Sequence, residues 1–251
     1  MVVATGGLSV PNTGSDGRGL GILADLGHTP HPTYPALTPL TADPAPYGRL
    51  AGISLPVTIT ARAGARGATS TGGFLFTHRG YSGPAVLDVA HVAVRSAAGD
   101  GPPARLAVRW TPKGDDDWLA ALRPTGGRTV ASALRAEIPD RLAVALLEAA
   151  RVDPARALAD LRRDERRRLS DTLVRATLPW TGHEGYRKAE VTGGGVSLAE
   201  IDPLTMESRR HRGLHLCGEV HDAFGPIGGY NFLWAWATGC AAGRGAAAAA
   251  E

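Results

Sequence analysis

Apolar and polar residues alternate along parts of this chain, which is the pattern of strands buried on one face. The alternation is clear at residues 53–61 and 105–110, and residues 73–78 give a third, more apolar strand signal. Short runs at residues 1–3 and 214–217 are typical of strands buried inside a sheet. A further strand is predicted at residues 189–191. The pattern therefore predicts a small β-unit in the middle of the chain and strands near both ends.

Helical spacing of apolar residues is concentrated in the middle of the chain. Helices are expected at residues 20–26, 84–94, 129–136, 139–151, 154–161, 164–173 and 231–243. Ser15 or Asp16 would cap the first helix and Ser82 the second, because short polar side chains accept hydrogen bonds from the first helical N–H groups. The middle of the chain is thus predicted to hold a β-unit with a helical cluster attached.

The segment between Pro30 and Pro46 contains six prolines, and this density predicts an extended connector. We interpret the connector as the exit from one domain into another. At 251 residues the chain is long enough for one large domain, or for two smaller ones that each bury a core.

The composition is that of a folded protein, with 43% apolar and 20% charged residues. The formal net charge is only +3, and the excess of arginine is concentrated in Arg162–Arg168, where Asp164 and Glu165 also lie. We interpret this run as a solvated helix face with paired charges, and we expect no nucleic-acid partner.

The two cysteines, Cys217 and Cys240, lie in apolar settings without the spacing of a metal site, which predicts two buried free thiols. No apolar run is long enough to cross a membrane, and no charged leader with a cleavage site is visible. We therefore expect a cytoplasmic protein with reduced thiols, no metal ligands and no membrane partner.

The stretch at residues 213–231 combines a buried strand, an acidic turn, a glycine loop and the start of a helix. Its informative positions are Gly218, Glu219, Asp222, Gly228, Gly229, Tyr230 and Asn231. A helix N-terminus offers unpartnered N–H groups and a partial positive charge to an electron-rich ligand edge, while a nearby carboxylate can bind hydroxyls. This combination suits a flavin, with the acid on the ribityl hydroxyls and the helix end on the pyrimidine carbonyl. The simpler interpretation is a turn whose acids cap local N–H groups.

The start of the chain is a short β-branched strand, Val2 and Val3, that runs directly into Thr5, Gly6 and Gly7. These glycines would admit a nucleotide phosphate or ribose close to the backbone. A tight turn from strand to helix explains them equally well, and the residues alone leave both interpretations open.

Several other polar and aromatic residues have simple interpretations. His215 alternates with apolar residues inside a predicted strand and is expected to be structural. His221 in the acidic turn could tune a flavin, but the favoured interpretation is an imidazole that faces solvent. Trp234 and Trp236 lie two positions apart on a helix, so they face different sides and do not form one aromatic cage. Residues 205–208 are interpreted as a turn before the last strand.

These motifs occur in a fixed order from one end of the chain to the other. They are Ala4–Gly7, Pro11, Thr13–Gly14, Asp16–Gly17, Leu75–His78, Ser82–Pro84, Val191–Thr192, Gly194–Val196, Thr205–Ser208, Gly218–Asp222 and Gly228–Asn231. On these residues the chain resembles the BaiN-type NAD(P)/FAD-dependent oxidoreductases, also described as aminoacetone oxidase-like flavoproteins. The resemblance implies an α/β fold with a partial flavin domain of two-dinucleotide-binding type. That domain would hold residues 1–40 and 189–251, interrupted by an inserted β-plus-helical domain at residues 41–188.

The resemblance also implies FAD as cofactor and NAD(P)H as candidate reductant, with hydride passing between the nicotinamide and a small organic substrate or oxygen. The implied cofactor-binding residues are Thr5, Gly6, Gly7, Gly218, Glu219, Asp222, Gly228, Gly229, Tyr230 and Asn231. His78 and Ser82 are substrate-side candidates, although a helix cap and a satisfied histidine explain them more simply. No residue has the pattern of a general acid or base, so no catalytic residue is assigned.

One feature of the resembled family is missing from the sequence. Members carry an N-terminal βαβ unit with Gly-x-Gly-x-x-Gly and a ribose-binding acid, and neither precedes Val2 here. The adenosine-diphosphate half of FAD would therefore lack its main cradle. The leading hypothesis is an N-terminally incomplete FAD-dependent oxidoreductase. The alternative is a flavin-incompetent remnant, or a subunit that needs a partner chain or segment to supply the dinucleotide-binding unit.

Overall fold

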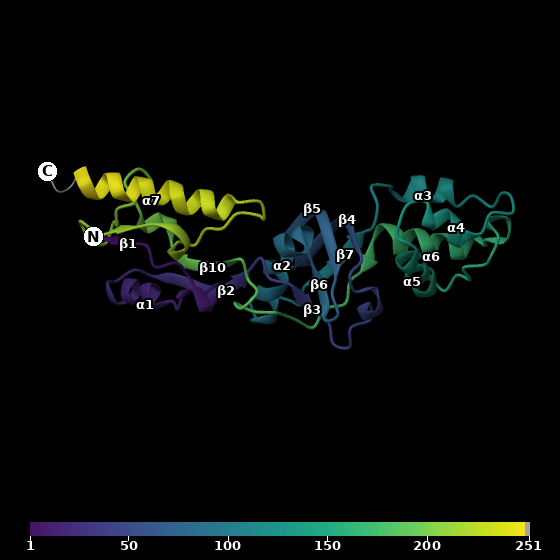
Figure 1. The fold of residues 1–251 in the computed structure, drawn as a ribbon, viewed down its shortest axis with the longest axis horizontal. Coiled ribbons are helices and arrows are strands. Elements are labelled where there is room, and N and C mark those ends of the chain that lie inside the picture. The colour runs from purple at the N-terminus through teal and green to yellow at the C-terminus, as the bar shows by residue number, and fades with distance from the viewer. Residues whose placement is uncertain (249–251) are drawn as a thin grey trace. The chain divides into compact units, whose positions relative to one another are not determined.

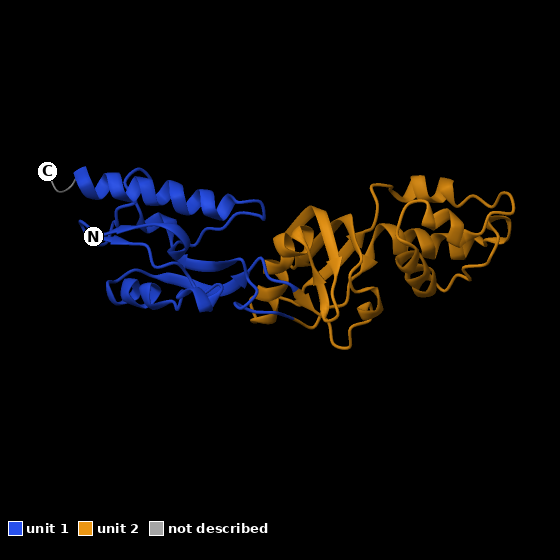
Figure 2. Cartoon of the chain, viewed as in Figure 1, with its two compact units in different colours: residues 1–39, 183–251 blue, residues 40–182 orange. Residues whose placement is uncertain are grey.

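The computed structural model describes residues 1–248 and divides the chain into two compact units (Figure 2). Unit 1 contains residues 1–39 and 183–251, so both ends of the chain contribute to it, and unit 2 contains residues 40–182. Helices and strands occur in both units, which confirms the predicted mixed α/β class.

Figure 1 shows the small sheets and the α-helices that the structure describes in unit 1. Its elements are β1 (Val2–Val3), α1 (Arg18–Asp25), β2 (Pro30–Ala36), β10 (Val191–Val196), β11 (His215–Leu216) and α7 (Tyr230–Ala248). Strand β1 pairs in parallel with β11, and β2 pairs antiparallel with β10. The predicted strands at the two ends of the chain are therefore confirmed, and they are partners of each other.

The proline-rich segment differs from its prediction at its start. Residues Pro30–Ala36 form strand β2 instead of an extended connector, with β10 as the paired strand. Proline is compatible with a strand whose outward N–H group needs no partner, and β2 lies in a two-stranded sheet. The glycines of β10 allow the close pairing: a Cβ on Gly194, which has φ of 80°, would lie 2.3 Å from the Pro32 carbonyl oxygen.

Unit 2 contains an antiparallel sheet with one long helix packed on it. The strand order is β8 (Ala176–Thr177), β7 (Arg105–Arg109), β4 (Ser54–Ala63), β5 (Arg66–Phe76), β6 (Gly80–Ser82), β3 (Leu40–Thr41) and β9 (Gly182–His183). Helix α2 (Pro84–Ala97) packs on β4 and β5. Its N-cap is Gly83 and not the predicted Ser82. Residue 83 has no room for a side chain, because a Cβ there would lie 2.7 Å from the Gly73 carbonyl oxygen.

The rest of unit 2 is a helical cluster. Its helices are α3 (Asp115–Ala121), α4 (Val130–Arg135), α5 (Asp140–Ala150) and α6 (Arg163–Val174). The helix predicted at residues 154–161 is wrong, since only Leu158–Asp160 forms one 3₁₀ turn. The backbone there pairs instead with residues 128–130. Helix α3 was missed because its seven residues are too few to show a helical period, although three aspartates favour a helix start there.

The arginine-rich run lies on α6 and is paired as expected. Arg168 forms an ion pair with Asp164 at 2.7 Å, and Arg162 forms one with Glu165 at 3.3 Å. These bonds neutralise part of the excess positive charge within a single helix turn. The interpretation as a solvated, internally paired helix face is therefore supported by its geometry.

The two units differ greatly in how well their apolar residues are covered. Unit 2 has the larger core, with Phe74, Phe76 and Trp110 packed ring to ring. In unit 1 the core is small, and helix α7 buries only three residues: Thr238, Ala242 and Gly245. Helix α7 extends through Ala248, beyond the predicted end at residue 243. No helix among the described residues is both long and apolar enough to cross a membrane.

Candidate functional site

A cavity of about 270 Å³ lies in unit 1 beside the first turn of α7. Its lining residues are Leu37, Glu190, Val191, Glu219, Ala223, Ile227, Gly228, Gly229, Asn231, Phe232, Trp234 and Ala235. Four of the predicted cofactor-binding residues are among them: Glu219, Gly228, Gly229 and Asn231. The walls are mostly apolar, and the carboxylates of Glu219 and Glu190 are the acidic groups among the lining residues.

Glu219 lies in a 3₁₀ turn, Gly218–Val220, that directly follows strand β11. Its Oε1 accepts hydrogen bonds from the Ser9 hydroxyl at 2.7 Å and from the Thr192 backbone N–H at 2.8 Å. Within residues 1–248 both recorded hydrogen bonds of this carboxylate fall on Oε1. Its second oxygen, Oε2, is therefore the one left to bind a ligand.

Thr192 connects this turn to the N-terminal loop. Its side chain is fully buried, and its Oγ1 accepts the backbone N–H groups of Leu8 at 2.7 Å and Ser9 at 3.1 Å. Gly7 lies against the same atoms: a Cβ at residue 7 would lie 2.5 Å from Thr192 Oγ1 and 2.6 Å from Glu219 Oε1. Only glycine fits there without displacing one of the two side chains.

The structure brings the segment of Thr5, Gly6 and Gly7 beside the Gly218–Glu219 turn, because β1 and β11 are paired. Only Gly7 reaches Glu219. Thr5 lies instead against α1, since a Cβ on Gly19 would lie 1.8 Å from its hydroxyl oxygen. Thr5 and Gly6 thus lie at the start of the loop between β1 and α1, and their role in cofactor binding stays a prediction.

Asp222 and Tyr230, two further predicted cofactor-binding residues, lie outside the lining of the cavity. The carboxylate of Asp222 is exposed and lies 3.9 Å from the imidazole of His31. Tyr230 lines a smaller neighbouring pocket together with Phe224 and Trp234.

The glycine loop and the start of α7 form the polar end of the cavity. Gly228 has φ of 125° and Gly229 has φ of 90°, values that favour glycine. The Asn231 amide holds the loop, because its Oδ1 accepts the Gly225 N–H at 2.8 Å and its Nδ2 donates to the Gly225 carbonyl at 3.1 Å. The first amides of α7 have no partner within the helix, and the N-terminus carries a partial positive charge.

Trp234 ties α7 to the acidic turn. Its Nε1 donates to the Gly218 carbonyl at 3.1 Å, and the Gly218 N–H donates to Thr238 Oγ1 at 2.9 Å. Trp236 is 74% exposed, which confirms that the two tryptophans face different sides. Trp234 therefore belongs to the site and Trp236 to the surface of α7.

The prediction that His221 faces solvent is wrong. The imidazole is fully buried and lies edge-on to Trp234, with ring centroids 5.9 Å apart. Its Nδ1 donates to the Gly218 carbonyl at 3.1 Å. Burial disfavours the charged form and lowers the pKa of His221 to about 4, so the ring is neutral near pH 7. The aromatic cover comes from the next helix and has no signal in the local sequence.

The cysteine prediction is also partly wrong. Cys217 is buried, and burial raises the pKa of its thiol, but Cys240 is exposed on α7. The described residues contain no group of three His, Cys, Asp or Glu side chains placed to hold a metal ion.

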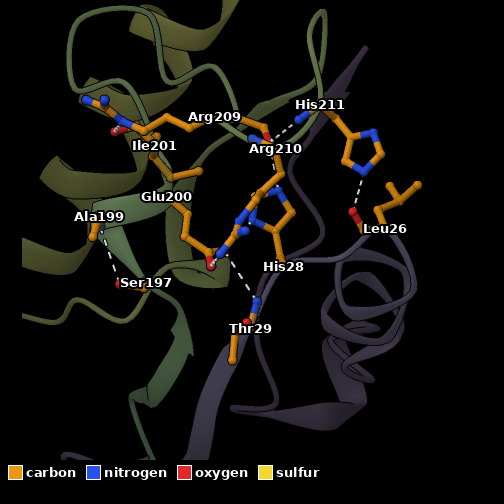
Figure 3. A network of polar contacts seen from close by, with 11 residues as sticks. Leu26, His28, Thr29, Ser197, Ala199, Glu200, Ile201, Arg209, Arg210 and His211 are labelled. Carbon is orange, nitrogen blue, oxygen red and sulfur yellow. Dashed lines mark hydrogen bonds and ion pairs between the residues drawn. The ribbon is translucent and has the colours of Figure 1, made fainter.

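A second polar cluster, centred on His28, was missed by the sequence interpretation (Figure 3). His28 is buried, with Nδ1 2.7 Å from Glu200 Oε2 and Nε2 2.8 Å from the Ser208 hydroxyl. Glu200 also binds Arg210 at 2.9 Å. Burial opposes the charge of Glu200, but hydrogen bonds from Arg210, His28 and the Thr29 N–H outweigh it and hold its pKa below the usual range.

The hydrogen bonds of this cluster run from the Glu200 carboxylate through the His28 imidazole to the Ser208 hydroxyl, but they do not make Ser208 a nucleophile. Ser208 Oγ already accepts the backbone N–H groups of Arg210 at 3.0 Å and His211 at 2.9 Å, and it is 6% exposed. Both oxygen lone pairs are engaged, and Ser208 lines neither of the two cavities described above. The cluster instead joins the start of β2 to the turn before β11. His215 is likewise structural, because it is buried and bonded to the Thr205 carbonyl at 2.9 Å.

The two substrate-side candidates lie in unit 2. His78 is exposed on the turn after β5, and Ser82 ends β6 opposite Leu75. A role toward substrate stays a prediction for both residues.

Residues 1–245 match the family model described as HI0933-like protein Rossmann domain. The chain is 35% identical over 243 residues to a ribosomal RNA dihydrouridine synthase of Escherichia coli (strain K12) and 34% identical over 242 residues to the protein of that name in Haemophilus influenzae. It is 31% identical over 254 residues to a 3-dehydro-bile acid delta(4,6)-reductase of Clostridium scindens. These matches cover 95%, 95% and 98% of this chain but only 58%, 58% and 62% of the three relatives. The chain thus spans about three fifths of the length of these curated relatives.

Proposed function

The chain belongs to the HI0933-like family, and from this premise we propose that it is an FAD-dependent oxidoreductase whose unit 1 holds the flavin end of the cofactor. The observation that carries the proposal is the cavity between the Glu219 carboxylate and the first turn of α7. Hydride would pass between a nicotinamide and an organic substrate or oxygen.

The residues around the cavity suit a flavin in both shape and chemistry. A volume of about 270 Å³ is small for a whole dinucleotide, so the cavity would take the ring system and the nearby ribityl carbons. Ile227, Phe232 and Trp234 offer apolar surface to the ring faces. The Glu219 carboxylate would accept a hydrogen bond from a ribityl hydroxyl, and the α7 N-terminus would lie at the pyrimidine edge.

When bound, FAD supplies the hydride chemistry, and the protein supplies position and electrostatics. The N-terminal amides of α7 favour negative charge, so they would stabilise the electron-rich pyrimidine edge of a reduced ring. Trp234 and Phe232 would keep water away from the ring. Glu219 would fix the ribityl chain and, through it, the position of the ring along the cavity.

The names of the relatives support one substrate class. Dihydrouridine is uridine in which a carbon–carbon double bond next to a ring carbonyl has been reduced. The bile acid reductase is named for reducing double bonds of a 3-dehydro compound, which carries a ketone. We propose that this chain also acts on a carbon–carbon double bond conjugated to a carbonyl, with His78 and Ser82 as candidates for contacting the substrate.

The direct test is a flavin titration of the purified 251-residue chain. We expect FAD to bind stoichiometrically, with a shifted visible spectrum and quenched fluorescence, and NAD(P)H to bleach the bound flavin without oxygen present. The Glu219→Gln variant should bind FAD about tenfold more weakly, because a charged acceptor becomes a neutral one. A chain that is folded by circular dichroism yet leaves the FAD spectrum unchanged would contradict the proposal.

A second candidate is a subunit that completes its cofactor site with another α/β unit. It is favoured by the apolar surface of α7, where Phe232, Leu233 and Trp236 are 75%, 65% and 74% exposed. The parallel pair β1–β11 points the same way, because parallel sheets normally have more strands and both faces covered. The occupant would be a unit that adds a parallel strand and carries a glycine-rich phosphate loop, a type of segment that the longer relatives have the length to contain.

Riboflavin separates the two candidates, because it lacks the adenosine-diphosphate half. Equal affinity of the chain for riboflavin and FAD would mean that the adenosine-diphosphate half of FAD contributes nothing to binding. This result is expected for a subunit that lacks its dinucleotide-binding unit. Much tighter binding of FAD would favour a chain that is competent alone. Binding of neither would favour a flavin-incompetent remnant.

A further inference from the structure

We propose that Thr192 and Ser9 are positioning residues that aim the Glu219 carboxylate at the ribityl chain of the flavin. This inference rests on the proposed flavin site and names two residues that determine how tightly the site binds. Neither residue lines the cavity, so both would act through Glu219.

The three residues are joined in a closed ring of hydrogen bonds. The Ser9 N–H donates to Thr192 Oγ1 at 3.1 Å, and the Thr192 N–H donates to Glu219 Oε1 at 2.8 Å. The Ser9 hydroxyl closes the ring by donating to the same Oε1 at 2.7 Å. A fourth donor, the Leu8 N–H, holds the Thr192 hydroxyl at 2.7 Å.

The ring of hydrogen bonds fixes the direction of the Glu219 carboxylate, because both bonds that reach it end on Oε1. Two donors converge on Oε1, so rotation of the carboxylate would break both bonds at once. Charge-assisted bonds of this kind are stronger than neutral ones. With Oε1 held, Oε2 is the oxygen that a ribityl hydroxyl would meet.

Thr192 is the central member of the ring. Its fully buried hydroxyl accepts two N–H groups of the N-terminal loop, and its own N–H reaches Glu219. Valine has the same shape but no hydroxyl, so Thr192→Val would leave two loop N–H groups unpaired. The loop would then move, and the Ser9 hydroxyl would leave Oε1.

The alternative is that the ring only stabilises the fold. Lumiflavin distinguishes the two roles, because it has the isoalloxazine ring but no ribityl chain. A positioning role predicts that Thr192→Val weakens riboflavin binding and leaves lumiflavin binding unchanged. A purely structural role predicts that both ligands are affected alike.

The experiment is a fluorescence titration of the full chain with riboflavin and with lumiflavin. We expect Thr192→Val to raise the riboflavin Kd about tenfold, and Thr192→Ser, which keeps the hydroxyl, to restore it. Ser9→Ala removes one donor and should raise the riboflavin Kd by a smaller factor. It also serves as the test if Thr192→Val fails to fold.

Thr111→Val is the matched control. Thr111 is a buried threonine of unit 2 whose hydroxyl accepts the Trp118 Nε1–H at 3.2 Å. Its loss should lower stability without changing the affinity for either ligand. The inference is overturned if Thr192→Val leaves the riboflavin Kd unchanged, raises both Kd values equally, or is not rescued by serine. If the unaltered chain binds neither ligand, the proposed function fails, and the inference fails with it.

Discussion

Gly7 and Glu219 approach each other so closely that a Cβ on Gly7 would lie 2.6 Å from the Glu219 carboxylate. The two residues are far apart in the sequence, and the parallel pairing of β1 with β11 brings them together. The Glu219 carboxylate therefore leaves no room for a side chain at residue 7.

Gly7→Ala should accordingly displace Glu219 or Thr192. We expect a loss of about 1–3 kcal/mol in the free energy of unfolding, as for other overpacked sites, together with weaker flavin binding. Urea denaturation and a riboflavin titration measure the two effects. Gly21→Ala on the open face of α1 is the control, because nothing lies within 4 Å of its added methyl group. That variant should be neutral or more stable, and equal behaviour of the two variants would contradict the close approach.

The Glu200 cluster predicts a loss of stability in acid. Its hydrogen bonds hold the pKa of Glu200 in the folded state below that in the unfolded state. The stabilisation is therefore fully present above the unfolded pKa of about 4.3 and is lost as the pH falls through the lower folded value. Glu200→Gln should lower the free energy of unfolding by about 1–3 kcal/mol near neutral pH, and the difference should shrink below about pH 4.

Urea denaturation near neutral pH and below about pH 4 measures the difference in unfolding free energy between Glu200→Gln and the unaltered chain. Glu148→Gln is the control, because the exposed Glu148 carboxylate forms an ion pair only with Arg49 among residues 1–248. Exposed pairs contribute about 0–1 kcal/mol, so this variant should be nearly neutral. A difference for Glu200→Gln that stays constant with pH would mean that the charge of this carboxylate is not what stabilises the cluster.

The sequence pattern predicted the elements better than it predicted their contacts. The alternation at residues 105–110 and the helical spacing at 139–151 match β7 and α5 closely, because both signals are local. Pro30–Ala36 misled the prediction, since proline density favours a connector unless a partner strand is present, and that partner is β10.

The site was predicted only in part for a related reason. Glu219, Gly228, Gly229 and Asn231 line the cavity as the local pattern indicated. Thr192 was visible only as a motif residue, because its bonds reach the loop at Ser9, which is distant in sequence. Such pairs of distant residues depend on the tertiary fold, and no periodic pattern in the sequence reveals them.

The burial of His221 predicts a second pH dependence, which begins at a higher pH than that of Glu200. Its pKa is about 4 in the folded protein and about 6.5 when the chain is unfolded, so between these values only the unfolded state binds the proton. The stabilisation is full above about pH 6.5 and declines as the pH falls toward 4. His221→Phe removes the titrating group and should flatten the change in unfolding free energy between about pH 7 and pH 5. An equally steep change in the variant would assign it to another group.

Trp234 and Trp236 should respond very differently to truncation, although they are two residues apart on α7. Trp234→Ala removes the Nε1 bond to Gly218 and the contact with His221, and should cost about 3 kcal/mol in urea denaturation. Trp236→Ala removes a side chain that is 74% exposed and should change the free energy of unfolding by less than about 0.5 kcal/mol. Repeating the measurement at several protein concentrations controls for self-association.

A large, concentration-independent loss for Trp236→Ala would mean that this face of α7 is already covered within the chain. That result would exclude the face as a docking surface for another α/β unit. The expected small change would mean that this face of α7 is not covered within the chain. Trp236→Ala should then weaken the binding of such a unit without lowering the stability of the isolated chain.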